Sequence, residues 1–193
     1  MSITERKTIL FTNLFMVART GSELHILELA KHFIENGWEA TIYTLTYGYP
    51  LQKELDSIGA KVVTFGNEHE LDEHYGVLYA QHKRVSEFLA SQPGIVFDRI
   101  IVSVLGVVTD EEALPFFTPS ADAVVFISDE AKEHYAADER LAGKRALVFP
   151  NTAPADFFAP PLQGANQRKS GSPDARRSSP IMLPRSSKIL PTS

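Results

Sequence analysis

Residues 8–45, TILFTNLFMVARTGSELHILELAKHFIENGWEATIYTL, carry the pattern that decides the fold. The apolar run at 8–12 is typical of a buried strand, and a second such run follows at 39–45. Between them an amphipathic helix is predicted over residues 22–36, where apolar side chains recur at helical spacing: Leu24, Leu27, Ala30 and Ile34. Asn36 and Gly37 end that helix, so a strand, a helix and a strand succeed one another without interruption.

The same alternation continues along the chain. Further strands are predicted at residues 60–65, 75–81, 98–106, 121–128 and 145–151. Further helices are predicted from Pro50 to Gly59, over residues 83–91, and from Ser128 through residue 137. Continuous apolar strands that alternate with helices imply a mostly parallel sheet covered on both faces. Residues 1–160 are therefore predicted to form one doubly wound, Rossmann-like α/β domain, whose ligands bind beyond the carboxyl ends of the strands.

Residues 161–193 differ from the rest of the chain. They have no periodicity and are rich in Pro, Ser and Arg. They carry a net charge of +5, and because the whole chain carries −5, residues 1–160 carry −10. We expect this basic tail to be disordered, since it cannot bury enough apolar surface to offset chain ordering. Its abrupt loss of pattern is typical of translation in a wrong frame or of a cloning artefact.

The composition excludes several classes of protein. The chain has no cysteine, so disulfides and thiolate metal sites are excluded and a cytoplasmic location is favoured. No apolar run is long enough to span a bilayer, and the first residues show no secretion signal. Nucleic acid is not an expected partner, because the acidic body would repel phosphates.

The familiar nucleotide and hydrolase motifs are absent. The chain contains no G-x-G-x-x-G loop, no G-K-[ST] sequence and no G-x-S-x-G elbow. These absences disfavour NAD-dependent enzymes, P-loop ATPases and esterases of that type. Residues 66–76, GNEHELDEHYG, hold four acids and two histidines, but a solvated loop is favoured over a metal site there. No metal is expected elsewhere, since His25 and His32 lie two helical turns apart.

The junction between the first strand and the first helix allows two interpretations. Thr20 and Glu23 fit a capping box, in which each side chain accepts a hydrogen bond from the other's backbone amide. Alternatively, the amides at the helix N-terminus bind a phosphate or diphosphate, and Gly21 allows its close approach. The Glu23 carboxylate would compete for those amides.

Three segments, in register, resemble the N-terminal domain of family 4 glycosyltransferases, which have the two-domain GT-B fold. Residues 20–44, TGSELHILELAKHFIENGWEATIYT, resemble the family's Gly-Gly-x-Glu loop and the helix after it. Thr20 replaces the first glycine and Trp38 replaces the usual histidine. The other two segments are ADAVVFISDEAKEHYA (121–136) and ALVFPNTAPADFFAP (146–160). The resemblance extends over about residues 7–160.

The resemblance implies transfer of a sugar from a nucleotide diphosphate sugar to a carbohydrate or lipid-linked acceptor. Such enzymes generally retain the anomeric configuration and need no metal cofactor. Binding of the donor diphosphate falls to Gly21 and Ser22, beside Thr20. The chain lacks the family's donor-binding C-terminal domain, so the isolated half is expected to be inactive. We expect a cytoplasmic protein that can also make peripheral contact with the inner face of the membrane.

Two alternatives to that function remain open. One is a non-catalytic acceptor-binding module that pairs with a separate donor-binding chain. The other is a different GT-B-like enzyme, such as a sugar epimerase.

The acceptor side of the cleft is expected at four positions. The family often has a strand ending in V-x-T-x-H-G, whereas this chain has IVSVLG at 101–106, which places Leu105 before Gly106. Leucine can neither donate a hydrogen bond nor move a proton. His82 resembles a histidine at an earlier strand end and is the candidate catalytic residue; the alternative is a surface histidine beside a helix start. Asn151 is expected at the cleft, or else in a turn after Pro150.

Overall fold

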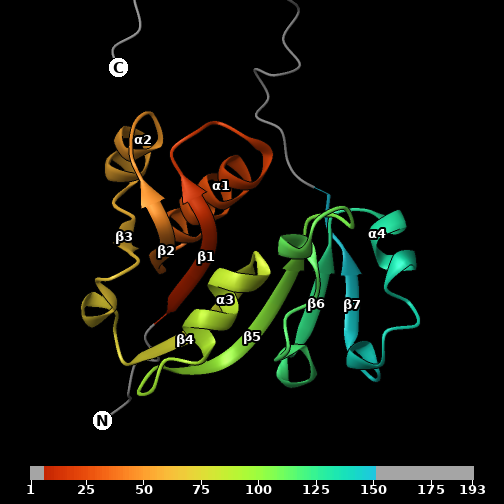
Figure 1. Cartoon of the computed structure of the whole chain (residues 1–193). Helices are drawn as coiled ribbons and strands as arrows, with labels where there is room; N and C mark the ends of the chain where they lie inside the picture. Colours follow the sequence, from red (N-terminus) through yellow and green to blue (C-terminus); the bar gives the residue numbers. More distant parts are fainter. Residues whose placement is uncertain (1–6, 151–193) are drawn as a thin grey trace, which may run out of the picture. The chain divides into compact units, whose positions relative to one another are not determined.

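The computed structural model describes residues 7–150 (Figure 1). In this part of the chain, seven parallel strands form one sheet in the order β3-β2-β1-β4-β5-β6-β7. The strands are β1 (Thr8–Met16), β2 (Glu39–Tyr47), β3 (Lys61–Thr64), β4 (His74–Gln81), β5 (Val96–Val104), β6 (Ala123–Phe126) and β7 (Arg145–Val148). The strand order reverses between β1 and β4, and this reversal is the switch point at which doubly wound sheets bind ligands.

Helices cover both faces of the sheet, which confirms the predicted α/β, Rossmann-like class. The α-helices are α1 (Gly21–Glu35), α2 (Leu51–Ile58), α3 (Lys83–Ala90) and α4 (Asp129–His134). Short 3-10 turns lie at η1 (Glu68–Glu70), η2 (Asp110–Glu112), η3 (Thr118–Ser120) and η4 (Glu139–Leu141). In Figure 1, α3 lies in front of the strands and α1 behind them.

Alternating side chains of each strand supply the two cores. On β1, Ile9 and Phe11 pack with α1 and α2, whereas Leu10 between them packs with α3. The reason is the two-residue period of a strand, which sends neighbouring side chains to opposite faces. Because both faces are buried, the strand reads as a continuous apolar run. Fully buried Leu89 of α3 alone contributes about 1.5–3 kcal/mol of burial free energy.

The predicted element bounds differ most at the strand ends. β1 continues to Met16, beyond the predicted end at residue 12, because its register with β2 runs on to Tyr47. Two polar residues, Thr12 and Asn13, do not interrupt the strand, because both side chains are buried and hydrogen-bonded. β6 and β7 are shorter than predicted, and α4 ends at His134 instead of residue 137.

Some predictions fall outside the described residues. They concern the boundary at residue 160, the basic tail at 161–193, and Asn151. Within residues 7–150, no helix is both long enough and apolar enough to cross a membrane.

Candidate functional site

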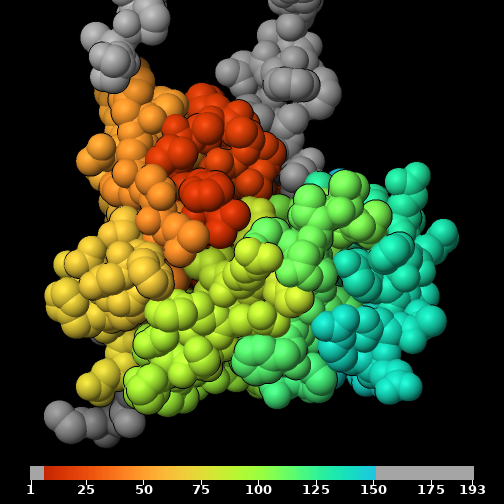
Figure 2. All heavy atoms as spheres, viewed as in Figure 1, coloured from red at the N-terminus to blue at the C-terminus, as the bar shows by residue number. Residues whose placement is uncertain are grey.

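The candidate site lies at the carboxyl ends of β1 and β4, where the two strands separate. The two strands pair only from Ile9 to Phe11 of β1. Beyond that point the buried Thr12 hydroxyl replaces the ladder, since it accepts from the Gln81 amide at 2.9 Å and donates to the Gln81 carbonyl at 2.8 Å. In Figure 2 the surface is hollowed just above, between the loop after β1 (red) and the loop after β5 (green).

Two buried amide side chains, Asn13 on β1 and Gln81 on β4, join β1 and the start of α1 to β4. Gln81 Nε2 donates to Asn13 Oδ1 at 2.7 Å and to the Ser22 carbonyl at 3.3 Å. Asn13 Nδ2 in turn donates to the Phe15 carbonyl at 2.7 Å. Sequence reasoning missed both residues. The signal was present, because each is a polar residue at the end of an otherwise apolar strand, where a parallel sheet meets its ligand.

His82 lies at the centre of this edge and is half-buried. It is the N-cap of α3, with a positive φ of 62°, and its Nδ1 accepts a hydrogen bond from the Leu14 amide at 3.0 Å. A neutral imidazole that accepts at Nδ1 carries its proton on Nε2. His82 stands at a helix start, as the alternative interpretation held, and it is half-buried; its catalytic role stays a prediction.

Burial keeps the His82 imidazole neutral. Desolvation lowers its pKa, while the carboxylates of Glu111, Glu23 and Glu112 raise it by a smaller amount. His82 thus offers a fixed Nε2–H donor at neutral pH. A donor of that kind suits a sugar hydroxyl or another oxygen acceptor.

The predicted capping box at the start of α1 is wrong. Thr20 is the N-cap, but its side chain makes no capping hydrogen bond to an amide. Its hydroxyl donates instead to the Glu23 carboxylate, and Ser22 Oγ donates to the same oxygen at 2.9 Å. Glu23 is only 5% exposed, so its buried carboxylate recruits both hydroxyls that would otherwise cap the helix.

Two of the three residues expected to bind a diphosphate, Thr20 and Ser22, therefore donate to a carboxylate of the chain itself. Thr20 and Gly21 are exposed and Ser22 is half-buried. The helix N-terminus attracts anions, but Glu23 already supplies a negative charge there. Diphosphate binding by these residues stays a prediction, and Glu23 weighs against it.

Leu105 and Gly106 are half-buried and follow the end of β5. They lie beside the acidic turn, which is η2 (Asp110–Glu112). A Cβ atom on Gly106 would lie 2.8 Å from a carboxylate oxygen of Glu112, so the glycine allows this close approach. That oxygen accepts hydrogen bonds from the amides of Val108 at 3.2 Å and Thr109 at 3.3 Å. Leu105 brings no hydrogen-bonding side chain to this edge.

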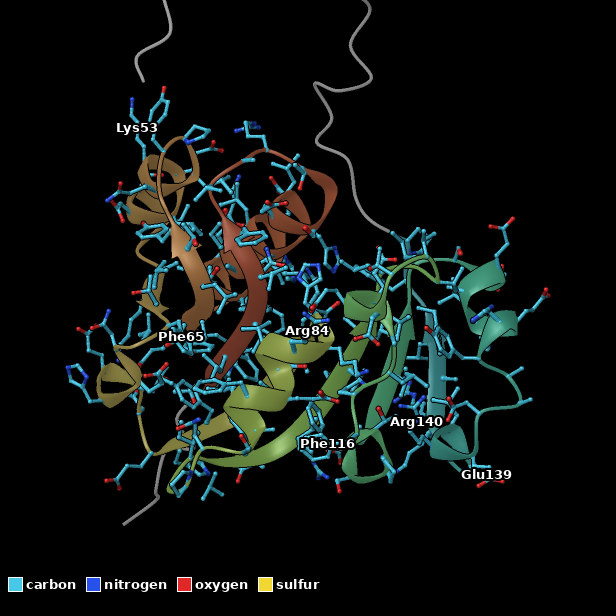
Figure 3. The ribbon with its side chains drawn as sticks, in the orientation of Figure 1. Lys53, Phe65, Arg84, Phe116, Glu139 and Arg140 are labelled. Atoms are coloured by element: carbon cyan, nitrogen blue, oxygen red, sulfur yellow. The ribbon has the colours of Figure 1, made fainter. Side chains whose placement is uncertain are left out.

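Ion pairs clamp the acidic turn onto the start of α3. Lys83 Nζ lies 2.9 Å from Asp110, and Arg84 Nε lies 2.9 Å from Glu111. Figure 3 shows Arg84 at the N-terminal end of α3. The site thus gathers two cations against four carboxylates, a formal charge of −2; the carboxylates are Glu23, Asp110, Glu111 and Glu112.

A second buried network links α1 to β4 and β5. His25 Nε2 lies 2.9 Å from the Tyr79 hydroxyl, which donates onward to Ser103 Oγ at 3.1 Å. Burial lowers the pKa of His25 and raises the pKa of Tyr79 to about 12, so both are neutral. His25 Nδ1 has no hydrogen-bond partner among the described residues.

The acidic segment at 66–76 has structural partners. Glu68 accepts from the Tyr43 hydroxyl at 2.5 Å and from the Gly66 amide at 2.8 Å, and His74 lies 2.9 Å from Asp98. Across residues 7–150, no three His, Asp or Glu side chains are placed to hold a metal ion.

The fold is shared with a solved glycosyltransferase. The structure of a glycosyltransferase from Rickettsia africae ESF-5 superposes with a TM-score of 0.55 at 17% identity. The match covers 80% of this chain and 45% of that chain, so this protein spans less than half of its neighbour's length. No known family and no curated protein matches the sequence. The structural likeness establishes the glycosyltransferase-like, Rossmann-type fold.

Proposed function

We propose that residues 7–150 form the acceptor-side half of a glycosyltransferase of the family 4 type. The reaction would move a sugar from a nucleotide diphosphate sugar to a carbohydrate or lipid-linked acceptor. The observation that carries the proposal is the open switch point between β1 and β4, in a parallel sheet shared with a solved glycosyltransferase. The three sequence segments that resemble family 4 point in the same direction.

The chemistry assigns a role to each side of the site. His82 would donate its Nε2–H to an acceptor hydroxyl, with Leu105 and Gly106 shaping the wall beside it. Thr20, Gly21 and Ser22 would border the donor diphosphate. Sugar transfer of this type needs no metal when amides and cations stabilise the charge that develops on the leaving diphosphate.

The charge balance argues that this half alone does not catalyse transfer. Lys83 and Arg84 are both paired with carboxylates of the acidic turn, and the edge as a whole is negative. The cations that stabilise a diphosphate would then come from a second half. The match to less than half of the R. africae protein is consistent with that need.

The alternative from another class is a non-catalytic module that binds the acceptor and pairs with a separate donor-binding chain. The match to 45% of the R. africae chain supports this alternative as well as it supports the first proposal. In either case we propose a cytoplasmic protein, with any membrane contact peripheral at the inner face.

The proposal is tested by binding and turnover together. The purified chain is titrated with simple saccharides and separately incubated with nucleotide sugars. We expect saccharide binding that His82→Ala weakens about tenfold, whereas His134→Ala on exposed α4 does not. No transfer or donor hydrolysis is expected from the chain alone. Clear turnover would contradict the proposal that this half is inactive by itself. Saccharide binding that His82→Ala does not weaken would contradict the assigned site.

A further inference from the structure

The face of α1 that packs on the sheet changes character along the helix. From Ile26 onward, the helix is anchored by apolar side chains that are buried in the core. The segment before it, residues 21–25, is anchored mainly by polar contacts. The Ser22 carbonyl accepts from Gln81 Nε2 at 3.3 Å, and one turn later the His25 ring is 3% exposed and bonded to β4. This first segment is therefore held by a few hydrogen bonds, which a change of charge can break.

The hydrogen bonds around His25 fix where its proton lies. The Tyr79 hydroxyl donates to Ser103 Oγ at 3.1 Å, so its oxygen accepts from His25 Nε2 at 2.9 Å. The neutral imidazole thus carries its proton on Nε2 and a lone pair on Nδ1. The Nδ1 atom is buried and has no hydrogen-bond partner among the described residues. A second proton would therefore create a buried N–H group without an acceptor.

Within residues 7–150, the groups that face His25 from other elements are uncharged near neutral pH. They are the Tyr79 hydroxyl of β4 and the Phe149 ring after β7, with Ser103 of β5 behind Tyr79. Burial raises the pKa of Tyr79 to about 12, so its hydroxyl keeps its proton. As far as the structure describes these elements, they offer no carboxylate to a charged His25.

On α1 itself, two glutamates lie near His25 in the sequence. Glu23 stands two residues earlier and accepts from two hydroxyls of its own turn, and Glu28 stands one turn later. Among the described residues, the His25 side chain is hydrogen-bonded to Tyr79 and to neither glutamate. Burial lowers the pKa of its imidazole, so the charged form is disfavoured while α1 stays packed on the sheet.

We propose that residues 21–25 form an acid-sensitive element of the fold, controlled by His25. When solvent adds a proton to Nδ1, this segment separates from β4 and the hydrogen bond between Ser22 and Gln81 opens. The rest of α1 stays in place. The change reaches the candidate site, because Gln81 immediately precedes His82. The inference goes beyond the proposed function and does not depend on it, since no substrate takes part.

The size of the effect follows from which form of the segment binds the proton. In the packed form the imidazole of His25 stays neutral, whereas in the open form it has the ordinary pKa of about 6.5. The open form therefore gains protons as the pH falls, and the packed form does not. Between about pH 7.5 and about pH 5.5, the ratio of open to packed segments should rise about tenfold.

The test is amide hydrogen exchange of the full chain, followed by NMR at these two pH values. Protection is the exchange rate of a free amide divided by the observed rate, which removes the intrinsic effect of pH. The amides of residues 24–29 report on the segment, because they donate to the carbonyls of residues 20–25, as Leu24 does to Thr20 at 3.0 Å.

We expect the amides of residues 24–29 to lose protection about tenfold at the lower pH. Those of residues 32–35 should keep theirs, because apolar side chains hold the later part of the helix on the core. An equal loss along the whole helix would show global unfolding and overturns the proposal. Unchanged protection of residues 24–29 overturns it as well.

Two glutamine variants on the same helix assign the effect to one imidazole. His25→Gln retains a side-chain N–H donor for Tyr79 and cannot be charged, so the loss of protection at residues 24–29 should disappear. His32→Gln is the matched control, because His32 is exposed two turns later, and it should show the same loss as the original chain. A tenfold loss that persists in His25→Gln overturns the assignment.

NMR of the histidine rings in the unmodified chain decides the matter if His25→Gln does not fold. Near pH 7.5 we expect His25 as the neutral tautomer with its proton on Nε2. Near pH 5.5 we expect the charged ring to appear together with the loss of protection at residues 24–29. A His25 ring that becomes charged while these amides stay protected overturns the proposal.

Discussion

Replacing Thr12 with valine should destabilise the fold more than any conservative change on the same strand. The Thr12 hydroxyl is fully buried and makes two hydrogen bonds to Gln81, one to its amide and one to its carbonyl. Valine has the same shape without the hydroxyl, so it leaves two backbone groups buried and unpaired. Each such group costs about 1–3 kcal/mol, so the variant should lose about 2–6 kcal/mol of unfolding free energy.

The assay is urea unfolding followed by circular dichroism, with the variant Thr12→Ser as the matched control. Serine keeps the hydroxyl and loses one methyl group, which costs about 1 kcal/mol. The slope of unfolding free energy against urea concentration should be the same for the variants and the original protein, because the surface exposed on unfolding is unchanged. A valine variant within about 0.5 kcal/mol of the original protein would refute the role given to Thr12 at the switch point.

Three further predictions concern neighbouring residues. Burial holds the pKa of His25 below its unfolded value, so the free energy of unfolding should fall as pH drops through about 6.5. In urea titrations, His25→Gln should make the fall in this free energy between pH 7.5 and 5.5 smaller by about 1 kcal/mol. Tyr79→Phe should cost about 1–3 kcal/mol on thermal unfolding, because it leaves His25 and Ser103 without their shared partner. Gly106→Ala should shift the Glu112 carboxylate at a cost near 1 kcal/mol, and proteolysis should show earlier cleavage in the turn after β5.

The alternation of strands and helices could be predicted because it depends on local periodicity. Apolar runs such as residues 8–12 and the helical spacing from Leu24 onward report directly which side chains are buried. Gly59 marks the end of α2 for an equally local reason, its left-handed φ of 78°. These signals do not depend on where the strands lie in the sheet.

Much of the candidate site could not be predicted because its contacts join distant residues. The Leu14 amide meets His82 across 68 residues, and Thr12 meets Gln81 across 69. The sequence indicated that such strand ends share one edge, but not which side chains would pair there. The capping box failed for a related reason: tertiary packing buries Glu23, and the buried carboxylate then takes the hydroxyls.

Photo-crosslinking of a diazirine-bearing saccharide, followed by peptide mass spectrometry, tests most directly that this chain binds its acceptor at the switch point. We expect cross-links only in peptides that contain His82 or residues 105–112, and we expect them to be lost when the unlabelled sugar competes. Cross-links concentrated on α2 or β3, or a pattern that competition leaves unchanged, would contradict it.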